Sequence, residues 1–199
     1  KHIGVTNFDV PRLQEILEAG VPVVSNQVQY SVLDHRPERG MVAFCEQHSI
    51  SLLCYGTLAG GFLSERYLGA PEPEHPLENR SLVKYKLIIE DFGGWALFQT
   101  LLTTLKRIAD KHAVSIAMVA TRYVIQKEKV GAAIVGVRHA RHLPETLRLF
   151  SFALDEDDLA TIKRITDVAK GPVGDVYVVE RIKGGKHAVI MKYNLSEDL

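Results

Sequence analysis

The sequence has few of the features that mark membrane, metal-binding or nucleic-acid-binding chains. Its two cysteines, Cys45 and Cys54, form no CxxC pair and have no group of histidines nearby, so no metal site is expected. No apolar run approaches the roughly 20 residues of a membrane span. Lysine plus arginine and aspartate plus glutamate number 24 each, and this balance argues against a nucleic-acid partner.

These absences predict a soluble protein of a reducing compartment, and we expect a cytoplasmic location. The chain begins at Lys1 and enters a strand-like segment almost at once. We therefore expect a segment upstream of Lys1, and any targeting signal would lie there.

The chain of 199 residues is 46% hydrophobic, enough for the core of one domain or of a large part of one. A strand followed by a helix recurs four times, with strands expected at residues 3–5, 21–29, 51–55 and 131–137. This alternation predicts a parallel sheet with right-handed crossovers. Four such units fit an open doubly wound sheet or half of a (β/α)₈ barrel, and spacing alone does not choose between them.

Apolar spacing predicts helices between these strands and after the last one. Asp9 or Val10, before Pro11, is expected to start the first helix. Ser115 and Asp155 are expected as helix caps, because their side chains can accept a hydrogen bond from a first-turn amide. Residues 64–94 read as an irregular insertion or as a lid with a short helix around 82–89, and they could line the substrate mouth. Two strand-like segments around Gly184 and Gly185 predict a hairpin in the tail.

The stretch SLLCYGTLAGGFL at residues 51–63 carries the first functional signal. A buried strand ends at Tyr55, and a loop with three glycines follows it at once. Glycine lets backbone amides approach an anionic ligand closely, and such loops bind ligands at the carboxyl ends of parallel strands. The competing interpretation is a tight connection without a ligand, which is common after strands.

Four motifs in order resemble the aldo-keto reductase family: IGVTNF at 3–8, SNQVQY at 25–30, CYGTLAGGFL at 54–63 and IVGVRHARHLPETL at 134–147. Their order and separation are similar to strands five to eight of that family's barrel. The resemblance extends to about Lys170. It implies an α/β fold, the C-terminal half of a (β/α)₈ TIM barrel at residues 1–170, with a hairpin-like tail at 171–199.

The resemblance also implies an NADP(H) site at the carboxyl ends of the strands. Amide and hydroxyl groups would hold the nicotinamide carboxamide, an aromatic ring would stack on the nicotinamide, and the glycine loop would wrap the pyrophosphate. The matching residues are Thr6, Asn7 and Gln27 for the carboxamide, Tyr55 for stacking, and Gly56, Thr57, Leu58, Gly60 and Gly61 for the pyrophosphate. Many members have Ser-Pro-Leu where this chain has Gly-Thr-Leu.

Four residues after the last strand match the positions that bind the adenosine end: Arg138, His142, Glu145 and Thr146. Arg138 favours NADP(H) over NAD(H), because a guanidinium can bind a 2′-phosphate through bidentate contacts. His142 stands where other members often have Arg or Gln, and Thr146 stands where many have Asn.

The family's catalytic Asp, Tyr, Lys and His come from the first half of the barrel, and the resemblance places none of them in this chain. No catalytic residue and no metal ligand is therefore assigned. We expect an NADP(H)-dependent reductase of aldehydes or ketones when intact, with this chain inactive alone. The missing half would lie in the same longer protein, in another chain, or be replaced by a second copy. Two alternatives are a regulatory or structural nucleotide-binding protein of the same fold and an unrelated phosphate-binding module.

Overall fold

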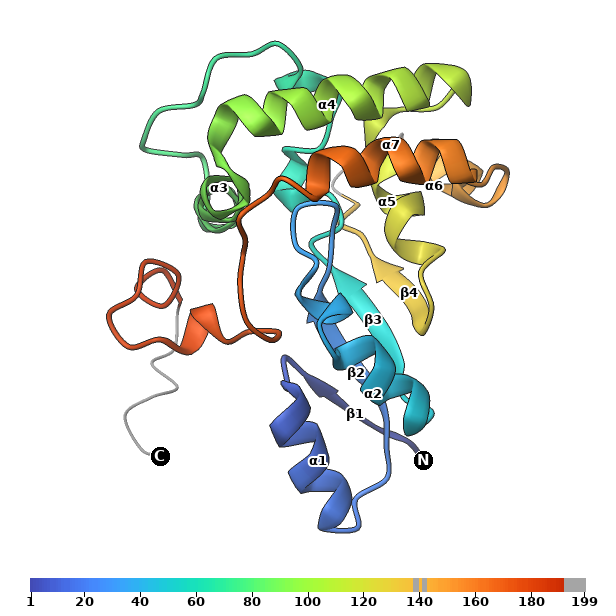
Figure 1. The fold of residues 1–199 in the computed structure, drawn as a ribbon, viewed down its shortest axis with the longest axis vertical. Coiled ribbons are helices and arrows are strands. Elements are labelled where there is room, and N and C mark those ends of the chain that lie inside the picture. Colours follow the sequence, from blue (N-terminus) through green and yellow to red (C-terminus); the bar gives the residue numbers. More distant parts are fainter. Residues whose placement is uncertain (138–139, 141–142, 192–199) are drawn as a thin grey trace.

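The computed structural model describes residues 1–137, 140 and 143–191. A four-stranded parallel sheet with strand order β1-β2-β3-β4 lies at its centre (Figure 1). The strands are β1 Ile3–Thr6, β2 Val23–Gln29, β3 Ser51–Tyr55 and β4 Val130–Ile134. Each strand pairs with its neighbour in the sequence, as in a barrel, whereas a doubly wound sheet reverses its order at a switch point. The strand order therefore agrees with the barrel alternative.

Seven α-helices follow the strands within the described residues. They are α1 Val10–Glu18, α2 Met41–Gln47, α3 Arg80–Phe92, α4 Gly94–Lys111, α5 Ile116–Ile125, α6 Leu143–Leu147 and α7 Glu156–Thr166. The two expected caps are confirmed, since Ser115 and Asp155 each accept a hydrogen bond from a first-turn amide. Of the two alternatives for the first helix, Asp9 is the cap and Val10 is the first helical residue. Helices α4 and α7 run side by side (Figure 1).

The sheet has one covered and one uncovered face. In β3, Leu52 and Cys54 are fully buried, while Ser51 is exposed and Leu53 and Tyr55 are half-buried. Successive side chains of a strand point to opposite faces, so Leu52 and Cys54 face the helical layer and Tyr55 faces the other side. This alternation places the candidate site residue Tyr55 on the uncovered face.

Two expected elements differ in length from the structure. The insertion contains a helix of 13 residues, α3, which begins after the cap Asn79 and is longer than the short helix expected there. Strand β4 ends at Ile134 instead of residue 137. The physical reason is that β3 ends at Tyr55, which pairs with Ile134, so residues beyond it have no partner strand in the described sheet.

The expected hairpin in the tail is wrong for the described part, residues 171–191. This segment forms turns and one short 3-10 helix at Val179–Arg181, with no strand. Two of its side chains bond to distant helices: Asp175 Oδ2 accepts from Val10 N, the first residue of α1, at 2.8 Å, and His187 Nε2 contacts Asp91 Oδ2 of α3 at 2.7 Å. These contacts draw the tail across the carboxyl ends of the strands.

Candidate functional site

A pocket lies at the carboxyl end of β3, where the glycine loop begins. The loop turns through left-handed backbone at Gly56 (φ 74°), Gly60 (φ 67°) and Gly61 (φ 104°), a region that favours glycine. The pocket has a volume of about 350 Å³. It is lined by Gly56, Thr57, Leu58, Gly60, Gly61, Ser81, Tyr85, Ile134, Val135 and Gly136. The five loop residues predicted to bind pyrophosphate are thus together on one wall.

Helix α3 explains two of the three glycines. A Cβ at Gly56 would lie 2.4 Å from the Tyr85 hydroxyl, and one at Gly60 would lie 2.9 Å from Tyr85 Cδ2. Both distances are too short for real carbon contacts, so the ring of Tyr85 requires glycine at these positions. A Cβ at Gly61 would meet nothing within 4 Å. Gly56 and Gly60 therefore allow α3 to pack against the loop, whereas the space beside Gly61 is open.

Thr57 supplies an unsatisfied polar group in the same wall. The residue is 1% exposed, and its Oγ1 is buried with no hydrogen-bond partner among the described residues. Buried hydroxyl groups are nearly always hydrogen-bonded in folded proteins. A ligand oxygen reaching the loop would give this hydroxyl a partner.

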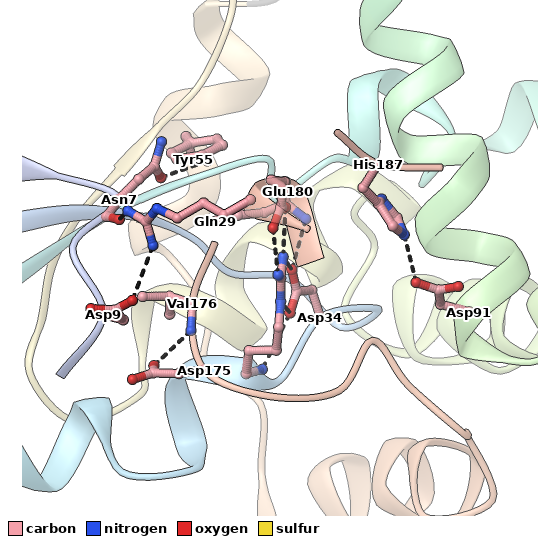
Figure 2. Close-up of polar contacts among 12 residues, drawn as sticks. Asn7, Asp9, Gln29, Asp34, Tyr55, Asp91, Asp175, Val176, Glu180 and His187 are labelled. Carbon is pink, nitrogen blue, oxygen red and sulfur yellow. Dashed lines mark hydrogen bonds and ion pairs between the residues drawn. The ribbon is translucent and has the colours of Figure 1, made fainter. Parts of the chain in front are cut away.

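The nicotinamide residues of the prediction meet at the ends of β1, β2 and β3. The Tyr55 hydroxyl donates to Asn7 Oδ1 at 2.8 Å (Figure 2), and the Asn7 amide donates to the Gln27 carbonyl at 2.9 Å. Asn7 has a left-handed backbone with φ 58°, which asparagine tolerates better than most residues. Among the described residues, neither the Asn7 Nδ2 group nor the Gln27 side-chain amide has a hydrogen-bond partner. Both amides are therefore available to a carboxamide.

Thr6 and Tyr55 differ in their exposure to solvent. Thr6 is exposed at the end of β1, where it pairs in register with Gln27. Tyr55 is half-buried, and burial raises the pKa of its phenol well above the usual range. Its ring therefore stays neutral at physiological pH.

The adenosine end of the predicted site is not brought to the pocket by the described residues. Arg138 and His142 lie outside those residues. Glu145 and Thr146 lie on α6 and do not line the pocket. These four assignments remain predictions from the resemblance.

A buried ionic cluster, not predicted from the sequence, ties the tail to the loop after β2. Arg36 donates to Asp34 through Nε at 2.9 Å and Nη2 at 2.7 Å, and to Glu180 through Nη1 at 2.8 Å and Nη2 at 3.0 Å (Figure 2). All three side chains are at most 1% exposed. The Gln29 amide also donates to Asp34 at 2.7 Å. No sequence pattern marks this pairing, because Arg36 and Glu180 are 144 positions apart.

A second tail contact reaches Asn7, one of the residues predicted to bind the nicotinamide. Arg181 donates through Nη2 to the Asn7 carbonyl at 2.6 Å and through Nη1 to Asp9 at 3.1 Å. These contacts place Arg181 of the tail beside the candidate site. Because Arg181 bonds the backbone carbonyl of Asn7, the Nδ2 group of Asn7 keeps no partner among the described residues.

Outside the pocket, the described residues show neither the arrangement of a metal site nor an accessible thiol. In the part of the chain that the structure describes, no group of three or more His, Cys, Asp or Glu residues is arranged to hold a metal. Cys45 and Cys54 are buried free thiols, and burial raises their pKa to about 11 and about 12. Among the described helices, none has the length and hydropathy to cross a membrane.

Comparison with known proteins places the same motifs in one family. The model of the aldo/keto reductase family matches residues 1–167. The flagellar radial spoke protein 5 of Chlamydomonas reinhardtii is 37% identical over 126 residues, which are 62% of this chain and 24% of that protein. Dihydrodiol dehydrogenase 3 of Bos taurus is 28% identical over 165 residues, which are 81% of this chain and 42% of that protein.

Solved structures show the same fold. A thermostable aldo-keto reductase in complex with the inhibitor epalrestat superposes with a TM-score of 0.60 at 25% identity, covering 82% of this chain and 48% of its own. An aldo-keto reductase from Klebsiella pneumoniae in complex with NADPH superposes with a TM-score of 0.59 at 19% identity, covering 83% of this chain and 48% of its own. The chain thus spans about half the length of these structures, and less of the two curated relatives.

Proposed function

Because the chain belongs to the aldo/keto reductase family, a family of oxidoreductases, we propose that it forms the NADP(H)-binding half of a carbonyl reductase. Residues 1–170 would supply strands five to eight of a (β/α)₈ barrel, and residues 171–199 a tail beside the substrate mouth. The other half would come from the same longer protein or from another chain. The substrate would be a small aldehyde or ketone.

The pocket of the glycine loop carries this proposal. It lies at the carboxyl ends of the strands, where ligands of parallel α/β folds bind, and its wall contains the unpaired Thr57 hydroxyl and the open side of Gly61. The adjacent Tyr55 and Asn7 continue the same edge toward β1. The donor set and the open wall fit a pyrophosphate followed by a nicotinamide.

The chain's own residues would bind and orient in this scheme. The loop amides and Thr57 would hold phosphate oxygens, and the amides of Asn7 and Gln27 would fix the carboxamide. Tyr55 would present one ring face as a platform, so that the opposite face of the bound ring is open to substrate. When bound, NADPH supplies the hydride for carbonyl reduction, and the proton donor would come from the N-terminal half of the barrel.

The preference for NADP(H) over NAD(H) rests on Arg138, whose guanidinium would bind the 2′-phosphate as the resemblance implies. The NADPH complex of the Klebsiella pneumoniae structure supports the same cofactor for the fold. Glu145, Thr146 and His142 would contact the adenosine.

A pocket-filling variant tests the proposal on the full-length protein. Ser81 is exposed, lies on α3 and lines the pocket, so Ser81→Phe fills the cavity without disturbing the core. Thr100→Phe, on the exposed side of α4, is the matched control. NADPH should raise the melting temperature of the wild type and of the control, and Ser81→Phe should lose that rise. If NADPH and NADH both leave the wild-type melting temperature unchanged, the proposed function is wrong.

One observation favours a second function. The relative with 37% identity is a flagellar radial spoke protein, so a structural or regulatory protein that binds the nucleotide without turnover is the alternative. NADPH oxidation with a panel of aldehydes separates the two. Nucleotide binding with turnover supports the reductase, and nucleotide binding with no turnover supports the alternative.

A further inference from the structure

Helix α3 brings one cation to the predicted nicotinamide platform. The Lys84 ammonium lies 5.0 Å from the centroid of the Tyr55 ring and 5.7 Å from that of the Tyr85 ring. No described carboxylate forms an ion pair with Lys84. The Lys84 ammonium thus lies against two aromatic rings, whose quadrupoles attract a positive charge.

The position of Lys84 is fixed by the residues around it. Asn79 caps α3 by accepting a hydrogen bond from Leu82 N at 3.0 Å, and the adjacent Tyr85 packs against Gly56 and Gly60 of the loop. The helix therefore cannot shift away from the pocket without losing the Tyr85 contacts. Lys84 stays beside Tyr55 for the same reason.

The surroundings of Lys84 are poorly solvated and mixed in charge. Burial lowers the pKa of Lys84, while the charge of Glu180 raises it, that of Arg36 lowers it and that of Asp34 raises it. Glu180 and Asp34 are already committed to Arg36. The three side chains of that cluster together carry one net negative charge, which offsets part of the Lys84 charge, but Lys84 is the charged side chain in contact with the ring of Tyr55.

The oxidised and reduced cofactors differ in charge at this place. The nicotinamide ring of NADP⁺ carries a positive charge, and that of NADPH is neutral. Lys84 occupies one face of the Tyr55 ring, which leaves the opposite face for a nicotinamide. Stacked aromatic rings have centroids about 4.5–7 Å apart, so a nicotinamide on that opposite face would lie on the order of 10 Å from the ammonium. At that range two like charges still repel appreciably in a partly buried site.

On the basis of the proposed function, we propose that Lys84 makes the site discriminate between the redox states of the cofactor, weakening NADP⁺ relative to NADPH. Lys84 would act through charge and not through a hydrogen bond to the cofactor. Such a bias favours NADPH loading and NADP⁺ release, and therefore the reduction of carbonyls.

The test is the ratio of the dissociation constants for NADP⁺ and NADPH, measured by calorimetry on the full-length protein. The wild type should bind NADPH about tenfold more tightly, which corresponds to ~1.4 kcal/mol. Lys84→Met and Lys84→Gln remove the charge and should bring the ratio close to one. Lys84→Arg retains the charge and should keep the wild-type ratio.

The ratio is taken within one protein sample, so partial misfolding of a variant does not change it. Equal affinity of the wild type for both nucleotides overturns the proposal even if no variant folds. An unchanged ratio in Lys84→Met also overturns the proposal. That result includes an equal loss of affinity for NADP⁺ and NADPH, which is what a residue that merely contacts the cofactor would give. If the wild type binds neither nucleotide, the proposed function fails, and the role of Lys84 fails with it.

Discussion

Glu180 is predicted to hold the tail over the strand ends, and removing its charge should release the tail. Its two hydrogen bonds to Arg36, at 2.8 and 3.0 Å, join a carboxylate and a guanidinium that are each 1% exposed. Glu180→Gln keeps the shape but leaves Arg36 with Asp34 as its one anionic partner in the described chain. Hydrogen bonds to charged groups contribute about 1.5–3 kcal/mol each, and breaking a buried pair is costly. We expect a loss of about 2 kcal/mol.

Amide hydrogen exchange of residues 171–191 measures this loss locally. A cost of about 2 kcal/mol corresponds to an exchange rate about thirtyfold faster in the variant. Glu46→Gln, an exposed glutamate of α2, is the matched control and should leave the tail unchanged. Equal exchange in both variants would refute the argument that Glu180 anchors the tail.

The same pair gives a pH dependence with a definite sign. Burial raises the pKa of Glu180, but the hydrogen bonds and charge of Arg36 outweigh it, and the net pKa lies below the ordinary 4.5. A carboxylate with a lowered pKa contributes stability above its unfolded pKa and loses it as the pH falls through the folded pKa. Tail protection should therefore decrease below about pH 4.3 in the wild type, and this decrease should be weaker in Glu180→Gln.

Three further changes test the candidate site. Tyr55→Phe removes a hydrogen bond worth about 1 kcal/mol but keeps the ring, so the NADPH affinity measured by fluorescence titration should stay within about threefold. Tyr55→Ala removes the ring and should lower that affinity at least about tenfold. Equal losses of affinity in the two variants would contradict the stacking role. Gly56→Ala should lower the free energy of unfolding in urea by about 2 kcal/mol more than Gly20→Ala. Both glycines have positive φ, but only a Cβ at Gly56 would meet a phenol oxygen, at 2.4 Å. Equal losses of stability in the two variants would show that packing against Tyr85 is not the cause. Asn79→Ala removes the cap of α3 and should lower the melting temperature by about 2–4 °C; no change would mean that the cap is not stabilising.

Local signals in the sequence were sufficient for most of the framework. Strand and helix spacing predicted the alternation, and Ser115 and Asp155 were predicted as caps because a cap depends on residues only three positions apart. The glycine loop after Tyr55 was also visible, since it follows directly from residue order. The choice between a barrel and a doubly wound sheet needed the strand order, which spacing does not encode.

The contacts that complete the site were not visible in the sequence. Tyr85 reaches the glycine loop from a helix about 25 positions away, so two glycines that suggested a phosphate cradle also serve packing against its ring. Glu180 and Arg181 reach Arg36 and Asn7 from the tail. A strand-like pattern predicted a hairpin there, but these long-range ion pairs and hydrogen bonds overrode it.

Titration of the full-length protein with NADPH and NADH, followed by nucleotide fluorescence, tests the central claim most directly. The account predicts saturable binding of one NADPH per chain, at least about tenfold weaker binding of NADH for want of a 2′-phosphate contact, and loss of both in Ser81→Phe. Binding that survives unchanged in Ser81→Phe, or no binding of either nucleotide, would contradict the claim that the pocket of the glycine loop is the cofactor site.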